Sequence, residues 1–152
     1  MAESPDESVA LLAARASIAD LVYTYARNIR AGRGADCLPL FTRDGVFEVR
    51  DQLLGSSQPP SVRARLEGQD AILAYLTNSA SGDTRVCPMI HNLLIEVNGD
   101  EAESSSVMTA LVSNGQSLFG EYLDRFRFED GWRFSSRTFT IMGDFIPSKA
   151  SI

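Results

Sequence analysis

A series of long apolar segments in residues 86–145, separated by short turn sequences, is the feature that most constrains the fold. The turn sequences are Asn98-Gly99-Asp100, Asn114-Gly115 and Asp130-Gly131. They combine residues that readily adopt the backbone angles of tight turns. The segments that they separate are residues 86–97, 102–112, 118–128 and 132–145. Four consecutive strands joined by tight turns predict an antiparallel meander.

The first half of the chain shows helical spacing instead. Its apolar side chains recur at Ile18, Leu21, Val22, Tyr25 and Ile29. This spacing places them on one face of a helix that starts near Ile18. Gly32 and Gly34 follow and predict its end. Two shorter helices are expected over residues 35–41 and 71–76.

Residues 42–67 predict one strand and a long loop. Alternating side chains in Val46–Arg50 predict a strand that follows a turn at Asp44-Gly45. Residues 51–67 contain several glycine, serine and proline residues with little periodicity, and we interpret them as a loop. A further turn or loop is expected over residues 79–83. Helices followed by a meander predict an α+β fold, and the absence of a linker or repeat predicts a single domain over residues 1–152.

Composition narrows the classes of partner. The 152 residues include 14 basic and 20 acidic ones, which gives a net charge of −6. Nucleic acids and anionic membranes need basic surfaces, so neither is an expected partner, and no apolar run reaches the roughly 18 residues of a membrane span. The acidic N-terminus is unlike a signal peptide, so a cytoplasmic location is expected. Cys37, Cys87 and the single histidine, His91, lack metal-binding spacing, and no cofactor is expected.

The order of these segments resembles the nuclear-transport-factor-2-like superfamily with its cystatin-like fold, and within it the SnoaL-like branch. The resemblance rests on Ile18-Ala19-Asp20-Leu21, Tyr25-Ala26, residues 40–47, His91-Asn92, residues 95–100, residues 122–126 and residues 130–134 up to Arg137. It implies a strongly curved, mixed or antiparallel sheet wrapped around three N-terminal helices. The implied shape is a cone-like α+β barrel with an apolar central pocket.

The resemblance also implies a range of functions. Members include polyketide cyclases, scytalone dehydratase, ketosteroid isomerase, limonene epoxide hydrolase and a dehydrochlorinase. Many are homodimers through the outer face of the sheet, and others bind without catalysis, so the fold alone does not assign a reaction. The expected ligand is a small hydrophobic molecule of polyketide, terpenoid, steroid or aromatic type.

Asp124 and Arg137 are the first candidate catalytic residues. Asp124 alternates with aromatic residues on one strand face, where burial would raise its pKa unless a cation pairs with it. If Asp130-Gly131 is a two-residue turn, which we favour, Asp124 faces Arg137. If the loop is one residue longer, Asp124 faces Ser136 and Arg137 moves to the other face. The resemblance places Asp124 where ketosteroid isomerases carry a protonated acid, and Arg137 where the dehydrochlorinase carries an arginine.

Tyr25 and His91 complete the candidate catalytic set. The resemblance places Tyr25 where ketosteroid isomerases carry their oxyanion-hole tyrosine. His91 lies in an apolar segment. It is expected to be either a general acid or base that lines the pocket or a hydrogen-bonded residue of the core. A turn at Gly99-Asp100 would pair His91 with Met108. The expected substrate-binding residues are Tyr122, Phe126, Phe139, Met108 and Val49.

Departures from the relatives limit the catalytic hypothesis. Arg30 replaces the aspartate of the dehydratase dyad, whose histidine would fall near Pro88, and the base of ketosteroid isomerase falls at Val49. Two hypotheses therefore stand. One is a cofactor-independent isomerase, cyclase or lyase that acts by proton transfer, and the other is a non-catalytic ligand-binding protein or dimeric scaffold. The catalytic hypothesis requires the candidate ionisable side chains to point into one cavity.

Overall fold

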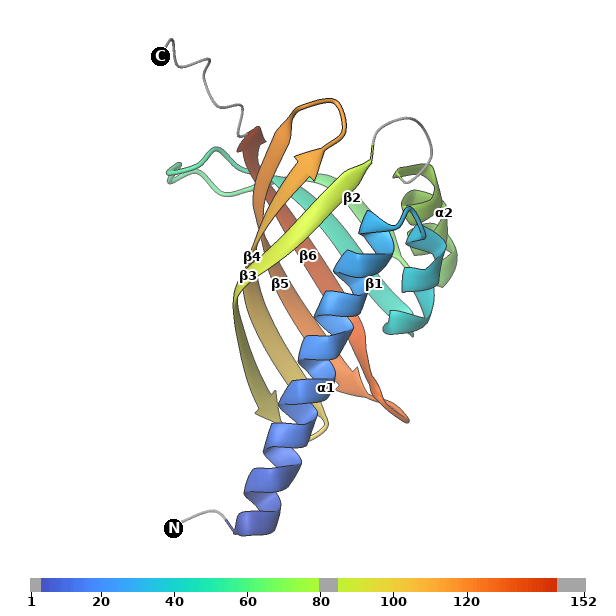
Figure 1. Cartoon of the computed structure of the whole chain (residues 1–152), viewed down its shortest axis with the longest axis vertical. Coiled ribbons are helices and arrows are strands. Elements are labelled where there is room, and N and C mark those ends of the chain that lie inside the picture. Colours follow the sequence, from blue (N-terminus) through green and yellow to red (C-terminus); the bar gives the residue numbers. More distant parts are fainter. Residues whose placement is uncertain (1–3, 80–84, 145–152) are drawn as a thin grey trace.

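A computed structural model describes residues 4–79 and 85–144 of the chain. Its elements are α1 (Pro5–Arg30), the 3-10 helix η1 (Gly34–Leu40), β1 (Phe41–Asp51), β2 (Ser61–Glu67), α2 (Gln69–Ser79), β3 (Val86–Asn98), β4 (Glu101–Val112), β5 (Ser117–Phe128) and β6 (Trp132–Asp144). The strands form one sheet in the order β2-β1-β6-β5-β4-β3, in which only the β1–β6 pair is parallel among the described strands. The long strands bend around α1 (Figure 1), and the sheet stays open between β2 and β3. The fold is therefore the predicted α+β cone, but without closure into a barrel.

α1 begins at Pro5, well before Ile18, where the prediction started the helix. The hydroxyl of Ser4 accepts a hydrogen bond from the backbone N–H of Glu7 at 3.2 Å, and the N–H of Ser4 donates to the carboxylate of Glu7 at 2.9 Å. This reciprocal pair is a capping box, a sequence signal that the prediction overlooked. At the other end, Gly32 has a φ of 71° and follows the helix end as predicted.

The core lies between α1 and the inner face of the sheet. Ile18 and Val22 are fully buried, as are Phe41 and Phe134, and the rings of Phe126 and Phe134 lie 5.0 Å apart. By length and composition α1 is also apolar enough to cross a membrane, which the prediction did not expect. A mostly buried core helix and a signal sequence near the N-terminus meet the same criterion, and 17% of the apolar window of α1 is buried.

Two segments of the first half differ from the prediction. Residues 61–67 form β2, which pairs antiparallel with β1, instead of belonging to a loop. Half-buried Ala64 and Leu66 alternate with exposed charged residues, which is a strand signal that the prediction missed. Asp44-Gly45 lies inside β1 and is not a turn. The turn expected over residues 79–83 falls almost entirely outside the described residues.

A bulge in β6 determines which residue faces Asp124. Phe128 pairs with Trp132, so the hairpin loop is one residue longer than the favoured two-residue turn. On its own, this loop would have turned Arg137 to the opposite face. Ser135 has no partner on β5, and this β-bulge shifts the register by one residue. Asp124 therefore faces Arg137, as predicted, but through two irregularities that offset each other.

A second bulge, in β3, reverses the orientation of the first half of that strand. Asn92 and Leu93 together lie opposite a single residue of β4, and Asn92 has a φ of 51°. Asparagine adopts this left-handed region more readily than most residues. Because the bulge shifts the register, Ile90 rather than His91 pairs with Met108. His91 therefore points to the outer face of the sheet.

Candidate functional site

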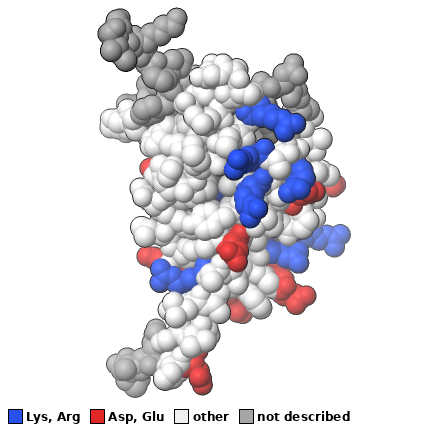
Figure 2. Space-filling model, viewed as in Figure 1, with Lys and Arg blue, Asp and Glu red and all other residues white. Residues whose placement is uncertain are grey.

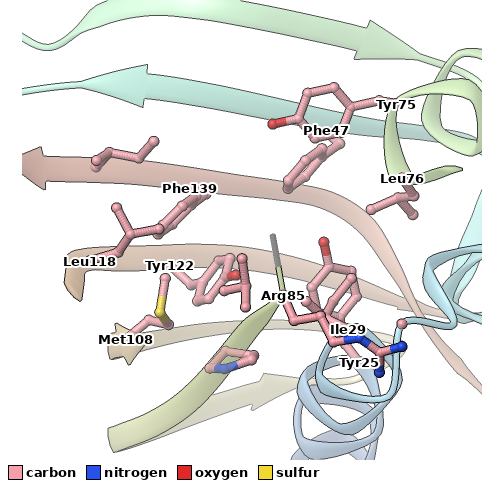
Figure 3. A pocket seen from close by; sticks show the side chains of 14 residues that line it. Tyr25, Ile29, Phe47, Tyr75, Leu76, Arg85, Met108, Leu118, Tyr122 and Phe139 are labelled. Carbon is pink, nitrogen blue, oxygen red and sulfur yellow. The ribbon is translucent and has the colours of Figure 1, made fainter. Parts of the chain in front are cut away.

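An apolar pocket lies where the C-terminal end of α1 meets α2 and the inner face of the sheet (Figure 3). Its cavity volume is about 190 Å³. It is lined by Tyr25, Ile29, Gly32, Phe47, Tyr75, Leu76, Arg85, Val86, Pro88, Met108, Leu118, Tyr122, Phe139 and Ile141. Pockets for drug-sized ligands measure roughly 300–1,000 Å³, so this cavity is suited to a molecule of one or two rings.

Two tyrosine hydroxyls supply the polar character of the pocket wall. Tyr25 and Tyr122 are 4% and 6% exposed, and both hydroxyl oxygens lie on the pocket side of their rings (Figure 3). Neither hydroxyl forms a hydrogen bond with another residue in the described part of the chain. Burial raises the pKa of Tyr122 to about 12 and that of Tyr25 well above its ordinary value. Both are therefore protonated at neutral pH and can donate a hydrogen bond.

Arg137 lies behind these tyrosines and does not line the cavity. Its guanidinium carbon is 3.6 Å from the ring centroid of Tyr122 and 4.2 Å from that of Tyr25. The ring of Phe134 is 4.7 Å away, and the side chain is fully buried. A cation over the face of a phenol ring is attracted to the ring electrons. The positive charge withdraws electron density from the ring, which strengthens the hydroxyl as a donor.

Asp124 shares this buried layer. Its Oδ1 is 3.4 Å from Nε of Arg137, and its Oδ2 accepts a 3.5 Å hydrogen bond from the hydroxyl of Ser104. Burial raises the pKa of Asp124 to about 6, while the Arg137 cation and the Ser104 hydroxyl limit the rise. Like Arg137, the carboxyl does not line the cavity.

His91 lies outside the pocket, contrary to the prediction. It is exposed on the outer face of the sheet and pairs with Val107. Its Nε2 lies 2.8 Å from the hydroxyl oxygen of Thr109 on β4. Of the four candidate catalytic residues, Tyr25 lines the cavity, Asp124 and Arg137 lie behind its wall, and His91 is on the other side of the sheet. The catalytic hypothesis required these four side chains to point into one cavity. The structure does not meet this requirement.

The expected substrate-binding residues divide into two groups. Tyr122, Phe139 and Met108 line the cavity, and the rings of Tyr122 and Phe139 stack with centroids 4.8 Å apart. Phe126 and Val49 are 1% exposed and belong to the core instead.

Ten of the fourteen described lining residues were not predicted as site residues, among them Phe47, Tyr75 and Arg85. Tyr75 on α2 packs against Phe47 on β1, with ring centroids 5.5 Å apart. The spacing of Ile72, Tyr75 and Leu76 on one helix face could have indicated that Tyr75 points inward. Arg85 precedes β3, and no sequence pattern marks it as a pocket residue. Among the described residues, no cluster of three or more His, Cys, Asp or Glu could hold a metal ion.

Comparison with known proteins places this geometry in context. The model of the SnoaL-like domain family matches residues 10–138. An NTF2-like protein with a cystatin-like fold from Novosphingobium aromaticivorans superimposes with a TM-score of 0.66 at 21% identity, over 95% of this chain and 90% of that one. For a hexachlorocyclohexane dehydrochlorinase (LinA) the TM-score is 0.70 at 18% identity, over 90% of each chain. For a Mycobacterium tuberculosis protein of unknown function it is 0.68 at 26% identity, over 93% of this chain and 78% of that one. No curated protein matches the chain.

Proposed function

Because the chain belongs to the family of SnoaL-like domains, we propose that its pocket binds a small, mostly apolar molecule through a carbonyl or phenolic oxygen. The observation that carries this proposal is the pair of buried hydroxyls, those of Tyr25 and Tyr122, which point into an apolar cavity. A hydrogen bond to such a donor is worth about 1 kcal/mol net. A ligand oxygen within reach of both hydroxyls would accept a hydrogen bond from each, which would fix the orientation of the ligand.

The lining favours binding over proton transfer. Both tyrosines keep their protons at neutral pH, so neither can serve as a general base. Among the described lining residues there is no carboxylate or imidazole. The lining thus has donors that orient a ligand and lacks the base that proton abstraction requires.

A second candidate function, in which His91 has no part, is a cofactor-independent isomerase, cyclase or lyase. Its substrate would be of polyketide, terpenoid or aromatic type, because a steroid with four rings is too large for a cavity of about 190 Å³. The contact of Arg137 with the rings of Tyr25 and Tyr122 favours this second function. Donors held in place by a buried cation suit a developing oxyanion, and removing one such donor typically costs about 3 kcal/mol of transition-state stabilisation. In this candidate the tyrosines polarise the carbonyl group, water accepts a proton from the α-carbon, and solvent returns a proton to the enolate at the new position.

A matched ligand pair tests the binding proposal. The bicyclic ketone 1-tetralone and the hydrocarbon tetralin share a skeleton and differ by one carbonyl group. We expect the ketone to bind about tenfold more tightly, because a hydrogen bond is worth about 1 kcal/mol and two donors are present. Tyr25→Phe and Tyr122→Phe should each remove part of this preference and leave tetralin affinity unchanged. Tyr23→Phe is the control, since Tyr23 is 45% exposed and does not line the pocket.

Isotope exchange separates the two functions. Bound 1-tetralone can be incubated in D₂O, with its α-protons followed by NMR. If the protein only binds the ketone, the α-protons exchange at the same rate as in buffer without protein. An enzyme accelerates the exchange, and the two phenylalanine variants then slow it. Equal affinity for ketone and hydrocarbon would contradict the binding proposal itself.

The proposal extends to a homodimer formed through the outer face of the sheet. Leu111 and Leu123 are 59% and 54% exposed there, and Met89 is 40% exposed. Exposed apolar side chains grouped on one face are typical of interaction surfaces. Sedimentation of the wild-type chain and of Leu123→Glu tests this, with a change from dimer to monomer as the expected result.

A further inference from the structure

Basic side chains gather around the mouth of the pocket, although the chain carries a net charge of −6. Arg27 and Arg30 lie in the last turn of α1, Arg33 follows it and Arg85 lies beside it. Figure 2 shows this basic group over the C-terminal end of α1. Ile29, in the same turn, lines the cavity. An anion that approaches the mouth therefore meets a positive surface on an otherwise acidic protein.

The helix itself explains only part of this group. Basic residues in a last turn stabilise the negative end of a helix dipole, which accounts for Arg27 and Arg30. Arg33 forms an exposed ion pair with Asp36 at 3.4 Å. Arg85 belongs to another segment, and neither explanation applies to it.

Arg85 is distinguished by its place on the rim of the cavity. It is the single charged side chain among the described residues that line the pocket. A methyl group placed on Gly32 would lie 3.9 Å from its Nη1, so the guanidinium extends across the end of α1. The backbone of Arg85 is fixed, because its N–H donates to the hydroxyl of Ser113 at 2.8 Å and its carbonyl accepts from the N–H of Ser113 at 2.9 Å. No acidic side chain in the described part of the chain forms an ion pair with Arg85.

We propose that the ligand of this pocket is an anion, namely a one- or two-ring carboxylate. Its rings enter the cavity, where a carbonyl or phenolic oxygen reaches the tyrosine hydroxyls, and its carboxylate binds Arg85 at the mouth. This inference rests on the proposed binding function and names the chemical class of its ligand. A guanidinium presents two parallel N–H donors that match the two oxygens of a carboxylate. The neighbouring arginines attract anions to the mouth and raise the association rate.

The test uses ligands of one shape and two charges. 2-Naphthoate and 2-naphthamide have the same rings, and benzoate and benzamide form a smaller pair. We expect each acid to bind the wild-type chain about tenfold more tightly than its amide, because a hydrogen-bonded ion pair is worth more than a neutral contact. Raising the salt from about 50 to about 500 mM should reduce this preference by screening. Calorimetry measures the four affinities.

Two variants assign the effect to its residue. Arg85→Gln should abolish the preference for the acids and leave amide affinity within twofold of wild type. Arg15→Gln, an exposed position earlier in α1, should leave every affinity unchanged. Labelled methionine methyl groups locate the ligand, since Met108 lines the pocket and Met89 lies on the outer face.

The outcomes separate this inference from the proposed function. Equal affinity for acid and amide, with a shift of the Met108 methyl signal, overturns the anionic class and leaves an apolar binding pocket. A preference that survives in Arg85→Gln overturns the role of Arg85. Failure of all four compounds and of 1-tetralone to shift Met108 overturns both proposals. Loss of the preference in Arg85→Gln alone supports the inference.

Discussion

The carboxylate of Asp124 lies 3.4 Å from Nε of Arg137, and both side chains are completely shielded from solvent. The Nη1, Nη2 and Nε atoms of Arg137 form no hydrogen bond with the described residues. Burial of an ion pair with incomplete hydrogen bonding costs desolvation energy that the mutual attraction offsets only in part. This pair is therefore a poor source of stability and makes stability depend on pH.

The pH dependence follows from the direction of the Asp124 shift. Its pKa rises from 3.8 to about 6 on folding. The protonated carboxyl is thus favoured in the folded state. Its contribution to the free energy of unfolding is fully present below about pH 4 and is lost as the pH rises through about 6. A shift of about two units corresponds to about 3 kcal/mol. Denaturation from pH 3.5 to 7.5 should show wild type losing about this much relative to Asp124→Asn. A constant difference between the two proteins across this range would contradict the assignment.

Replacing Gly120 with alanine should destabilise the fold. A Cβ at this position would lie 2.5 Å from the carbonyl oxygen of Thr140 and 2.6 Å from the ring of Phe139. Because the backbone oxygen cannot move freely, overpacking should cost about 3 kcal/mol in the free energy of unfolding. The displaced Phe139 ring should also weaken ligand binding. Chemical denaturation measures the loss, and Glu121→Ala on the exposed side of the same strand should change stability by less than about 0.5 kcal/mol.

His91→Gln should leave ligand affinity unchanged. The imidazole lies outside the pocket, and its Nε2 is 2.8 Å from the hydroxyl oxygen of Thr109. Loss of that exposed hydrogen bond should cost no more than about 1 kcal/mol. The NMR signals of the wild-type imidazole should keep their chemical shifts when 1-tetralone is added. A ligand-dependent change in these chemical shifts would instead place His91 in contact with the site.

Substitutions at Asn92 should separate backbone strain from side-chain effects. Its φ of 51° disfavours β-branched residues and suits glycine. We expect Asn92→Gly to change the free energy of unfolding by less than about 0.5 kcal/mol, and Asn92→Val to lower it by about 1–2 kcal/mol. Equal effects of the two substitutions would show that the bulge does not depend on this backbone angle.

The fold class and the order of all elements except β2 could be predicted, because periodicity and turn residues indicate which face of an element is buried. Strand irregularities could not. A bulge adds one residue and no distinctive composition, yet it exchanges the two faces of everything beyond it. The predicted pairing of Asp124 with Arg137 was correct only because the bulge at Ser135 offset a hairpin loop that is one residue longer than expected. The predicted orientation of His91 was wrong because no second irregularity offset the bulge at Asn92. Arg85 was missed because its role depends on where α1 ends in space.

The bulge at Asn92 has a further consequence for solubility. β3 is the outermost strand on its side of the sheet, with one row of backbone amides and carbonyls unpaired within it. A regular edge of this length would be a template for strands from other molecules. The bulge interrupts that row near its middle, so Asn92, which turns His91 away from the pocket, also makes this edge a poorer template for pairing with a strand of another molecule.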